Sequence, residues 1–538
     1  MASYLETIPL DILQHIAVLS GSSSALEPPG NLYRLLQTSS TIYQSLNAHL
    51  SPHIYSRLFS SKFDTRAHCR RYRGRLPDSA FAAELLCRSK LLRRSHRAEL
   101  STDGLIQDLW TALWMFLEND SLNEQQLLAA GFPHFLLSLA RMKLSDTDTD
   151  GRTDNYTIKM LIIWLLSLTL SRQIIMDMSK AHRDELYGLI YPYIFMDKQE
   201  IPPKLRTSGD SGHTMPVYVY LCRQMPLVPE PAIAAIHLTL VLLESNTLQI
   251  PPHLPETRAI AIATLRSGPT IEDYRFMASY ETTLSKATHR SPDPACAALP
   301  ISTEPDPSTN NDMFFGAILR SLGEAQSTET FAYTPGTMSG LWEGVFRILN
   351  MPITNIDSSA DHDSLFSSGL IFPMQCAMVE FVCSDFGIQS NPLDPDILVD
   401  SDICPPHLIS TNDTELAFNG RRYKKHTIHS GTAPANDDIE TKIPAQEARS
   451  CSDVMLLGQT LDDYDQAWGG YKFSGRVTNN GRVLLKREQK YTDGQQRGVW
   501  IFEGYLRSDS LLLGRWRVSG NPSAVDKGVF SMGKARGR

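Results

Sequence analysis

The chain has 538 residues, of which 42% are hydrophobic and 20% charged, and its formal net charge is −8 at pH 7. This is the composition of an ordinary soluble globular protein. The length calls for several domains, since one domain usually holds about 100–200 residues. The acidic balance does not favour nucleic acid as the main partner.

The eight cysteines are scattered and form no Cys-x-x-Cys pair, so we expect neither a zinc framework nor a redox motif. Such sparse thiols fit a reducing compartment. The opening residues MASYLETIPL lack a basic segment followed by an apolar run, so no secretory signal is predicted. The longest apolar runs, 160–170 and 232–243, fall short of the roughly 18–20 residues of a membrane span. These features predict a cytoplasmic or nuclear protein without a membrane partner.

The stretch YLETIPLDILQHIAVLS (4–20) has the pattern of a short amphipathic helix. Pro9 suits a first turn, where a missing N–H costs nothing, and Asp11 places a negative charge at the positive end of the helix dipole. Ile12, Leu13, Ile16 and Leu19 then recur at helical spacing, which predicts one apolar face.

A second, leucine-rich helical pattern covers residues 31–59. The two patterns together carry more apolar side chains than about 55 residues can hide, and units of this size are marginal alone. An exposed apolar face of this kind favours a partner protein.

These residues resemble the F-box, whose pattern is Leu-Pro, an acidic residue, apolar residues on one helix face and a leucine-rich second helix. The sequence departs from that pattern at Ile8, where leucine is usual, and in the long connector GSSSALEPPG (21–30). The resemblance implies docking to the Skp-type adaptor of a cullin-based ubiquitin ligase. It assigns the adaptor contacts to Ile8, Pro9, Leu13, Ile16, Leu19, Leu32, Leu35 and Leu36. The alternative is a helical hairpin packed on the next domain.

Residues 62–97 contain eleven basic and three acidic residues. The apolar spacing of Phe81, Leu85, Leu86 and Leu92 favours an amphipathic helix whose basic face is solvated. A nuclear-import signal or a nucleic-acid patch are the alternatives.

Residues 61–286 show helical periodicity and predict a helical domain. Stacking of its helices as in a solenoid is one arrangement, although no fixed period is found. Trp110, Trp114 and Trp164 are expected in its core. Five prolines within residues 287–312 predict a linker or an exposed loop, because proline blocks both helix and central strand.

Residues 313–538 change to a period of two and predict an antiparallel β domain with a flexible insertion near 429–450. Asn480-Gly481 is a strong hairpin signal, and a second hairpin is expected with its turn at Ser508-Asp509. Trp500, Phe502 and Leu506 should share one face, matched on the next strand by Leu512, Trp516 and Val518. Glycines inside these strands are typical of a small barrel.

The stretches GLWEG, AWGGYKFSGRV, GVWIFEGYLR and LLGRWR resemble the C-terminal β domain of one group of F-box proteins, distantly similar to the cyclin-binding type. That resemblance implies a barrel that holds the client. Candidate client contacts are the aromatics beside glycines, Trp342, Trp468, Tyr471 and Trp500. The alternative for each is packing in the barrel core, since aromatics at alternating strand positions are usually core residues.

Two short stretches imitate sites of other chemistry. SDTDTDGRTDN (145–155) mimics an EF-hand loop, but Thr157 stands where the bidentate glutamate is needed. SGDSGH (208–213) mimics a serine-protease loop, but it lies in a helical region without the barrel strands of such an enzyme. The sequence thus predicts no catalytic residue, no metal ligand and no cofactor.

The fold expected is α+β and multidomain: an F-box of three helices over residues 1–60, a helical middle, a proline-rich linker and a β domain resembling an antiparallel barrel. The function expected is a non-catalytic substrate receptor of an SCF-type ubiquitin ligase, with the β domain binding an unknown client. The alternative is a small-molecule-binding barrel without a ubiquitin role, since a barrel of this size can hold one ligand. An enzyme with an unrecognised site is a third possibility.

Overall fold

The computed structural model describes the following residues: 4–22, 30–71, 76–145, 153–196, 218–220, 223–225, 231–243, 250, 253–266, 270–275, 307–312, 333–349, 371–383, 409–412, 414–418, 421–426, 454–464, 470–478, 481–490, 499–508, 510–519 and 527–535. The predicted insertion at 429–450 lies outside them.

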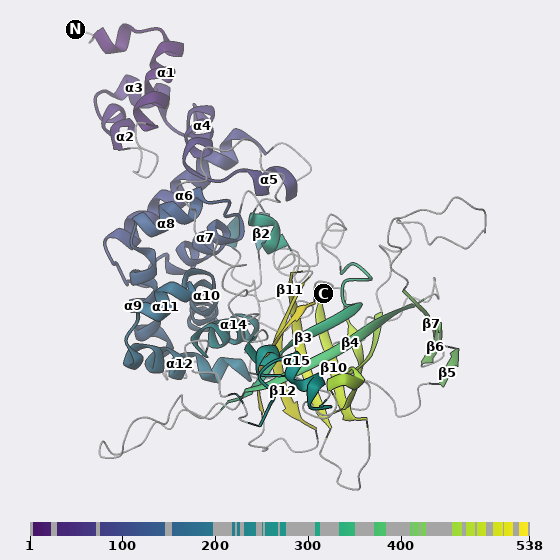
Figure 1. Ribbon diagram of the computed structural model, residues 1–538. Helices are drawn as coiled ribbons and strands as arrows, with labels where there is room; N and C mark the ends of the chain where they lie inside the picture. The colour runs from purple at the N-terminus through teal and green to yellow at the C-terminus, as the bar shows by residue number, and fades with distance from the viewer. Residues whose placement is uncertain are drawn as a thin grey trace, which may run out of the picture. The chain divides into compact units, whose positions relative to one another are not determined.

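The chain forms two compact units, each assembled from separate stretches of sequence (Figure 1). The first unit comprises Met1–Leu170, Gln199–Pro231 and Arg290–Leu322. The second comprises Ser171–Lys198, Ala232–His289 and Gly323–Arg538. The α+β class is confirmed, with helices in the N-terminal region and an antiparallel barrel in the C-terminal part.

The first unit is mainly helical. Its elements are η1 (Tyr4–Thr7), α1 (Leu10–Gly21), α2 (Gly30–Leu36), α3 (Ser40–Leu46), α4 (Pro52–Lys62), α5 (Arg66–Arg71), α6 (Asp78–His96), α7 (Leu105–Leu117), α8 (Leu122–Ala129), α9 (Phe132–Leu144), α10 (Thr153–Thr169), the hairpin strands β1 (Tyr218–Tyr220) and β2 (Arg223–Met225), and η4 (Pro307–Asn311). Helix α7 is apolar around most of its circumference and is buried along nearly its whole length. Two of its side chains, Trp110 and Trp114, stack on each other with 5.9 Å between their ring centroids. These two residues and Trp164 are core residues, as predicted.

The solvated basic face predicted within residues 62–97 is wrong for part of its length. Arg88 of α6 is fully buried, with its guanidinium 4.7 Å from the ring centroid of Phe59. Its charge is balanced by Glu118 at 2.8 Å and by Glu84 at 3.1 Å. A buried guanidinium needs both ion pairing and hydrogen-bond acceptors, and a helix pattern gives no sign of acceptors that come from other helices.

The predicted proline-rich linker ends in a docked segment. Within residues 287–312 the structure describes η4 and Asp312. Asp312 accepts hydrogen bonds from the Nε atoms of Arg70 at 3.0 Å and Arg71 at 2.8 Å. The N–H of Ser308 donates to Asp120 at 3.0 Å. These contacts hold this segment on the first unit through residues that the sequence suggested were solvated.

The second unit contains helices and a closed barrel. Its elements are α11 (Arg172–Asp177), α12 (Lys180–Ile194), α14 (Pro231–Leu243), α15 (Arg258–Ala263), η8 (Asp462–Tyr464), β3 (Gly340–Ile348), β4 (Ile371–Cys383), β5 (Ile409–Asn412), β6 (Glu415–Phe418), β7 (Arg421–Lys425), β8 (Val454–Gln459), β9 (Tyr471–Val477), β10 (Arg482–Gln489), β11 (Trp500–Ser508), β12 (Leu511–Val518) and β13 (Lys527–Lys534).

The barrel consists of eight antiparallel strands in chain order, β3, β4 and β8 to β13. Strand β13 pairs with β3, and β3 pairs with β4, so the sheet closes on itself. The short meander β5–β6–β7 is inserted between β4 and β8 and continues the sheet from β4 (Figure 1). Closure leaves the barrel strands without a free edge.

Both predicted hairpins are confirmed by strand pairing. Strands β9 and β10 pair antiparallel across a turn in which Gly481 has φ of +77°. Strands β11 and β12 pair with Phe502 opposite Trp516 and Leu506 opposite Leu512, which is the expected shared face. These side chains point into the barrel, because Phe346 of β3 meets the ring of Trp516 edge-on at 5.5 Å. The inner face is therefore largely aromatic.

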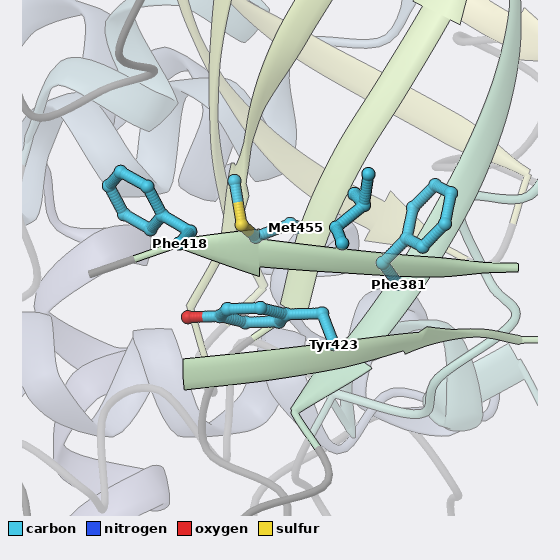
Figure 2. Close-up of a cluster of buried hydrophobic side chains, with 5 residues drawn as sticks. Phe381, Phe418, Tyr423 and Met455 are labelled. Carbon is cyan, nitrogen blue, oxygen red and sulfur yellow. The ribbon is translucent and has the colours of Figure 1, made fainter. Parts of the chain in front are cut away.

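The sequence does not predict the meander, because β7 reads Arg-Arg-Tyr-Lys-Lys, with one apolar residue in five. That residue, Tyr423, is fully buried against Phe381 and Met455 on the outer wall of the barrel (Figure 2). Leu416 and Phe418 complete the cluster. A single well-placed ring thus anchors a strand that is otherwise charged.

Outward-pointing arginines join the barrel to the helices of its own unit. Arg515 donates to the carbonyls of Ile194 at 3.2 Å and Met196 at 3.3 Å, at the end of α12. Arg347 donates to the carbonyl of Leu243, the last residue of α14, at 3.2 Å. Cations at helix C-termini satisfy the last carbonyls and oppose the negative end of the dipole.

Close approach of neighbouring strands requires glycine at position 514. A Cβ there would lie 2.1 Å from the carbonyl oxygen of Glu503 and 2.4 Å from the ring of Phe530. We expect Gly514→Ala to lower the free energy of unfolding by about 1–3 kcal/mol, since an added methyl in a packed core forces backbone shifts. Gly188→Ala is the control, because nothing lies within 4 Å of that added Cβ in α12 and alanine favours a helix. Urea unfolding followed by circular dichroism measures both, and equal effects would contradict the account.

Glu503 makes the stability of the folded state depend on pH. Burial alone would raise its pKa, but Arg515 and Arg482 outweigh burial and hold the pKa at about 2. A carboxyl whose pKa falls on folding stabilises the folded state above its unfolded pKa, and this stability is lost as pH falls through the folded value. Glu503→Gln should therefore cost about 3 kcal/mol at pH 7 and flatten the stability curve between about pH 4.5 and pH 2. Glu488→Gln, at a half-exposed ion pair with Lys486, should change little. A Glu503→Gln curve parallel to wild type across that window would refute the assignment.

Candidate partner-binding face

Helix α1 has two different apolar sides. Leu13, Ala17 and Gly21 are buried and recur every four residues, so they form the stripe that packs inward. Gly21 lies so close to α4 that an added Cβ would be 2.7 Å from the side chain of Leu58. Ile12 and Leu19 are seven residues apart, lie on another side of the helix and are 49% and 58% exposed.

The following helices bury part of their apolar residues and expose the rest. Leu32, Ile42 and Leu46 are at most 2% exposed and form the interior with Leu13 and α4. Ser39 opens α3 by accepting a hydrogen bond from the N–H of Thr41 at 3.2 Å, and its hydroxyl donates to the Glu6 carboxylate. The exposed apolar residues, named here the N-terminal apolar set, are Leu10, Ile12, Leu19, Tyr33, Tyr43 and Leu50, each 49–64% exposed.

One member of this set, Tyr43, interacts with a buried phenol. Tyr55 of α4 is 5% exposed, and burial, with a smaller contribution from Tyr43, raises its pKa to about 12. The hydroxyl is therefore neutral at physiological pH.

The eight residues predicted to contact an adaptor fall into three groups. Pro9 and Leu19 are exposed, whereas Leu13 and Leu32 are buried within the bundle. The remaining four, Ile8, Ile16, Leu35 and Leu36, are partly buried. The single apolar face predicted for α1 is thus divided, because Ile12 and Leu19 point away from Leu13.

The sequence analysis missed Leu10, Tyr33, Tyr43 and Leu50 as surface residues. For Leu10 the signal was an excess: α1 carries apolar residues at positions 10, 12, 13, 16, 17, 18 and 19, which no single side of a helix can accommodate. Sequence alone did not say which of these positions would be buried. The packing of Gly21 on Leu58 decides that question.

The four aromatics predicted to grip a client are in different places. Trp342 is fully buried inside the barrel, and its indole N–H donates to the carbonyl of Met338 at 2.8 Å. Tyr471 of β9 and Trp500 of β11 are partly exposed, and both lie against the guanidinium of Arg487. Trp468 lies outside the described residues.

Within the described part of the chain, no group of three or more His, Cys, Asp or Glu side chains is placed to hold a metal ion. No described helix combines the length and apolar character that crossing a bilayer requires. The loop that mimics an EF-hand is described only at Ser145 and residues 153–155, and the stretch at 208–213 lies wholly outside the described residues.

Comparison with protein-family models, with curated proteins and with solved structures found no match to this chain.

The division of α1 into a buried and an exposed side predicts opposite outcomes for adjacent residues. Leu13→Ala should lower the free energy of unfolding by about 2–4 kcal/mol, because it empties a buried site. Ile12→Ala should change it by less than about 0.5 kcal/mol, since Ile12 is a surface residue. Thermal unfolding of the two variants measures the difference, and a larger loss for Ile12→Ala would show that the faces are assigned the wrong way round.

Proposed function

We propose that the chain is a non-catalytic substrate receptor of an SCF-type ubiquitin ligase. Residues 1–60 would act as an F-box that docks a Skp-type adaptor, and through it a cullin. The barrel unit would bind the client protein. The observation that carries this proposal is the N-terminal apolar set, six large apolar side chains left exposed on short helices whose sequence resembles the F-box.

Contact of so many large apolar side chains with water is unfavourable, and a partner surface that covers them removes this cost. A stable protein interface buries roughly 800 Å² on each side, and a few large apolar side chains usually supply most of its energy. Isolated surface leucines are ordinary, but six large apolar residues within residues 10–50 are a concentration that marks interaction sites. Two residues of the F-box pattern are exposed here: Leu19, which belongs to this set, and Pro9.

The proposed mechanism involves no covalent chemistry in this chain. A receptor that holds a client on one unit and the ligase on the other raises the effective concentration of the client's lysines near the ubiquitin-charged enzyme. Tyr471 and Trp500, the predicted client contacts that keep exposed surface, are available for such binding on the barrel.

Adaptor capture tests the proposal. The double variant Ile12→Asp with Leu19→Asp should bind a purified Skp-type adaptor at least about thirtyfold more weakly, because each change buries a carboxylate in an apolar contact. Both residues are exposed in the free chain, so the fold should be unaffected. They are better targets than Leu13, whose loss would also destabilise the bundle.

The matched control is Leu265→Asp, which puts the same charge at a leucine 95% exposed in the second unit. It should bind the adaptor as wild type does. Failure of the wild-type chain to bind, or equal binding by the double variant, would refute the F-box assignment.

A further inference from the structure

Arg487 of β10 lies inside the barrel. It is directly opposite Phe473 on β9 and Trp500 on β11, so the three side chains share the inner face. The guanidinium carbon is 3.8 Å from the ring centroid of Trp500 and 4.1 Å from that of Tyr471. It also lies 5.0 Å from the ring of Phe346, which belongs to β3 on the far side of the barrel.

Among the described residues, this guanidinium has aromatic neighbours, and its Nε atom has no acceptor. Arg487 is 3% exposed, and its Nε has no hydrogen-bond partner in the structure. Among the described residues no carboxylate forms an ion pair with it, whereas Glu503 on the outer wall pairs with both Arg482 and Arg515. Burial lowers the pKa of Arg487 to about 10, opposed by Tyr471, so the side chain remains charged at neutral pH.

Arg88 in the first unit shows what a complete site of this type contains. It also has two aromatic rings over its faces, at 4.7 and 5.1 Å. In addition, its N–H groups donate to Glu84, Asn123 and Glu118. Rings satisfy the faces of a guanidinium, while the N–H donors lie in its plane and need acceptors. Arg487 has the aromatic rings of this arrangement, but its buried Nε has no acceptor among the described residues.

At the other end of the barrel a buried carboxylate has its hydrogen-bond donors. Glu380 accepts backbone hydrogen bonds from Gly336 at 2.5 Å, Met338 at 2.5 Å and Ser339 at 2.8 Å, which fixes the loop that leads into β3. Trp342 and Phe502, at most 1% exposed, contribute to the packed interior.

The end at which Arg487 lies keeps accessible aromatic surface. Tyr471 and Trp500 are partly exposed, and Phe372, which stacks on Phe346 at 5.1 Å, is 36% exposed. These rings therefore offer exposed aromatic surface beside Arg487 at this end of the barrel.

We propose that this end of the barrel binds a small organic carboxylate with a flat apolar body, with its carboxylate on Arg487. A carboxylate matches the planar fork of a guanidinium with two parallel hydrogen bonds, and it neutralises a buried charge. The flat apolar body matches the faces of Tyr471, Trp500 and Phe372. This site is independent of adaptor docking, because all its residues belong to the second unit.

The test compares 2-naphthoate with its neutral amide, 2-naphthamide, by isothermal titration calorimetry on the full chain. The acid should bind at least about tenfold more tightly than the amide, since a hydrogen bond to a charged group contributes about that factor or more. This comparison needs no variant, so it does not depend on whether a substitution folds. Equal affinity of acid and amide, or no binding of the acid up to about 10 mM, would overturn the proposal.

The variant Arg487→Met should reduce binding of the acid to the level of the amide. Its unfolding midpoint in urea should be at or above wild type, because it replaces an unpaired buried charge by an apolar side chain of similar length. The matched control is Arg476→Met on β9, a buried arginine that contacts Phe418 at 4.8 Å on the outer wall and should leave binding unchanged. Undiminished binding of 2-naphthoate by Arg487→Met would also overturn the proposal.

Discussion

Closure of the eight-stranded sheet is the constraint on which the second unit depends. Strand β3 pairs with β13 on one side and with β4 on the other, so no barrel strand keeps a free edge. Closure at this size brings bulky inward side chains together in a narrow interior. Glycines on the neighbouring strands leave the room that these side chains need. Gly504 and Gly514 face each other and leave room for the ring of Phe530. The aromatic interior therefore depends on the glycines that also allow the strands to approach closely.

Three buried charged groups, from the two units, have compensating partners. Arg88 has three acceptors, Glu380 has three backbone donors, and Glu503 has two arginines. Each group is compensated because an unpaired buried charge costs several kcal/mol. Arg487 departs from this pattern at the end of the barrel where aromatic side chains reach the surface. That combination of burial, charge and access is what favours a ligand there.

The sequence predicted those features that are decided locally. Asn480-Gly481 and the alternation around Trp500 and Trp516 place two hairpins and their inner face, because turn chemistry and a period of two act over a few residues. It did not predict the burial of Arg88, whose partner Glu118 is thirty residues away. Nor did it predict β7, where the contacts of Tyr423 with Phe381 and Met455 decide the outcome. The exposed side of α1 depends in the same way on Gly21 meeting Leu58.

The central claim is that another polypeptide covers the N-terminal apolar set. Hydrogen–deuterium exchange of the full chain, with and without a purified Skp-type adaptor, tests it most directly. The account predicts slower exchange in α1 to α3 on addition of the adaptor and unchanged exchange in the barrel strands. Unchanged exchange in those helices at saturating adaptor, or protection confined to the barrel, would contradict it.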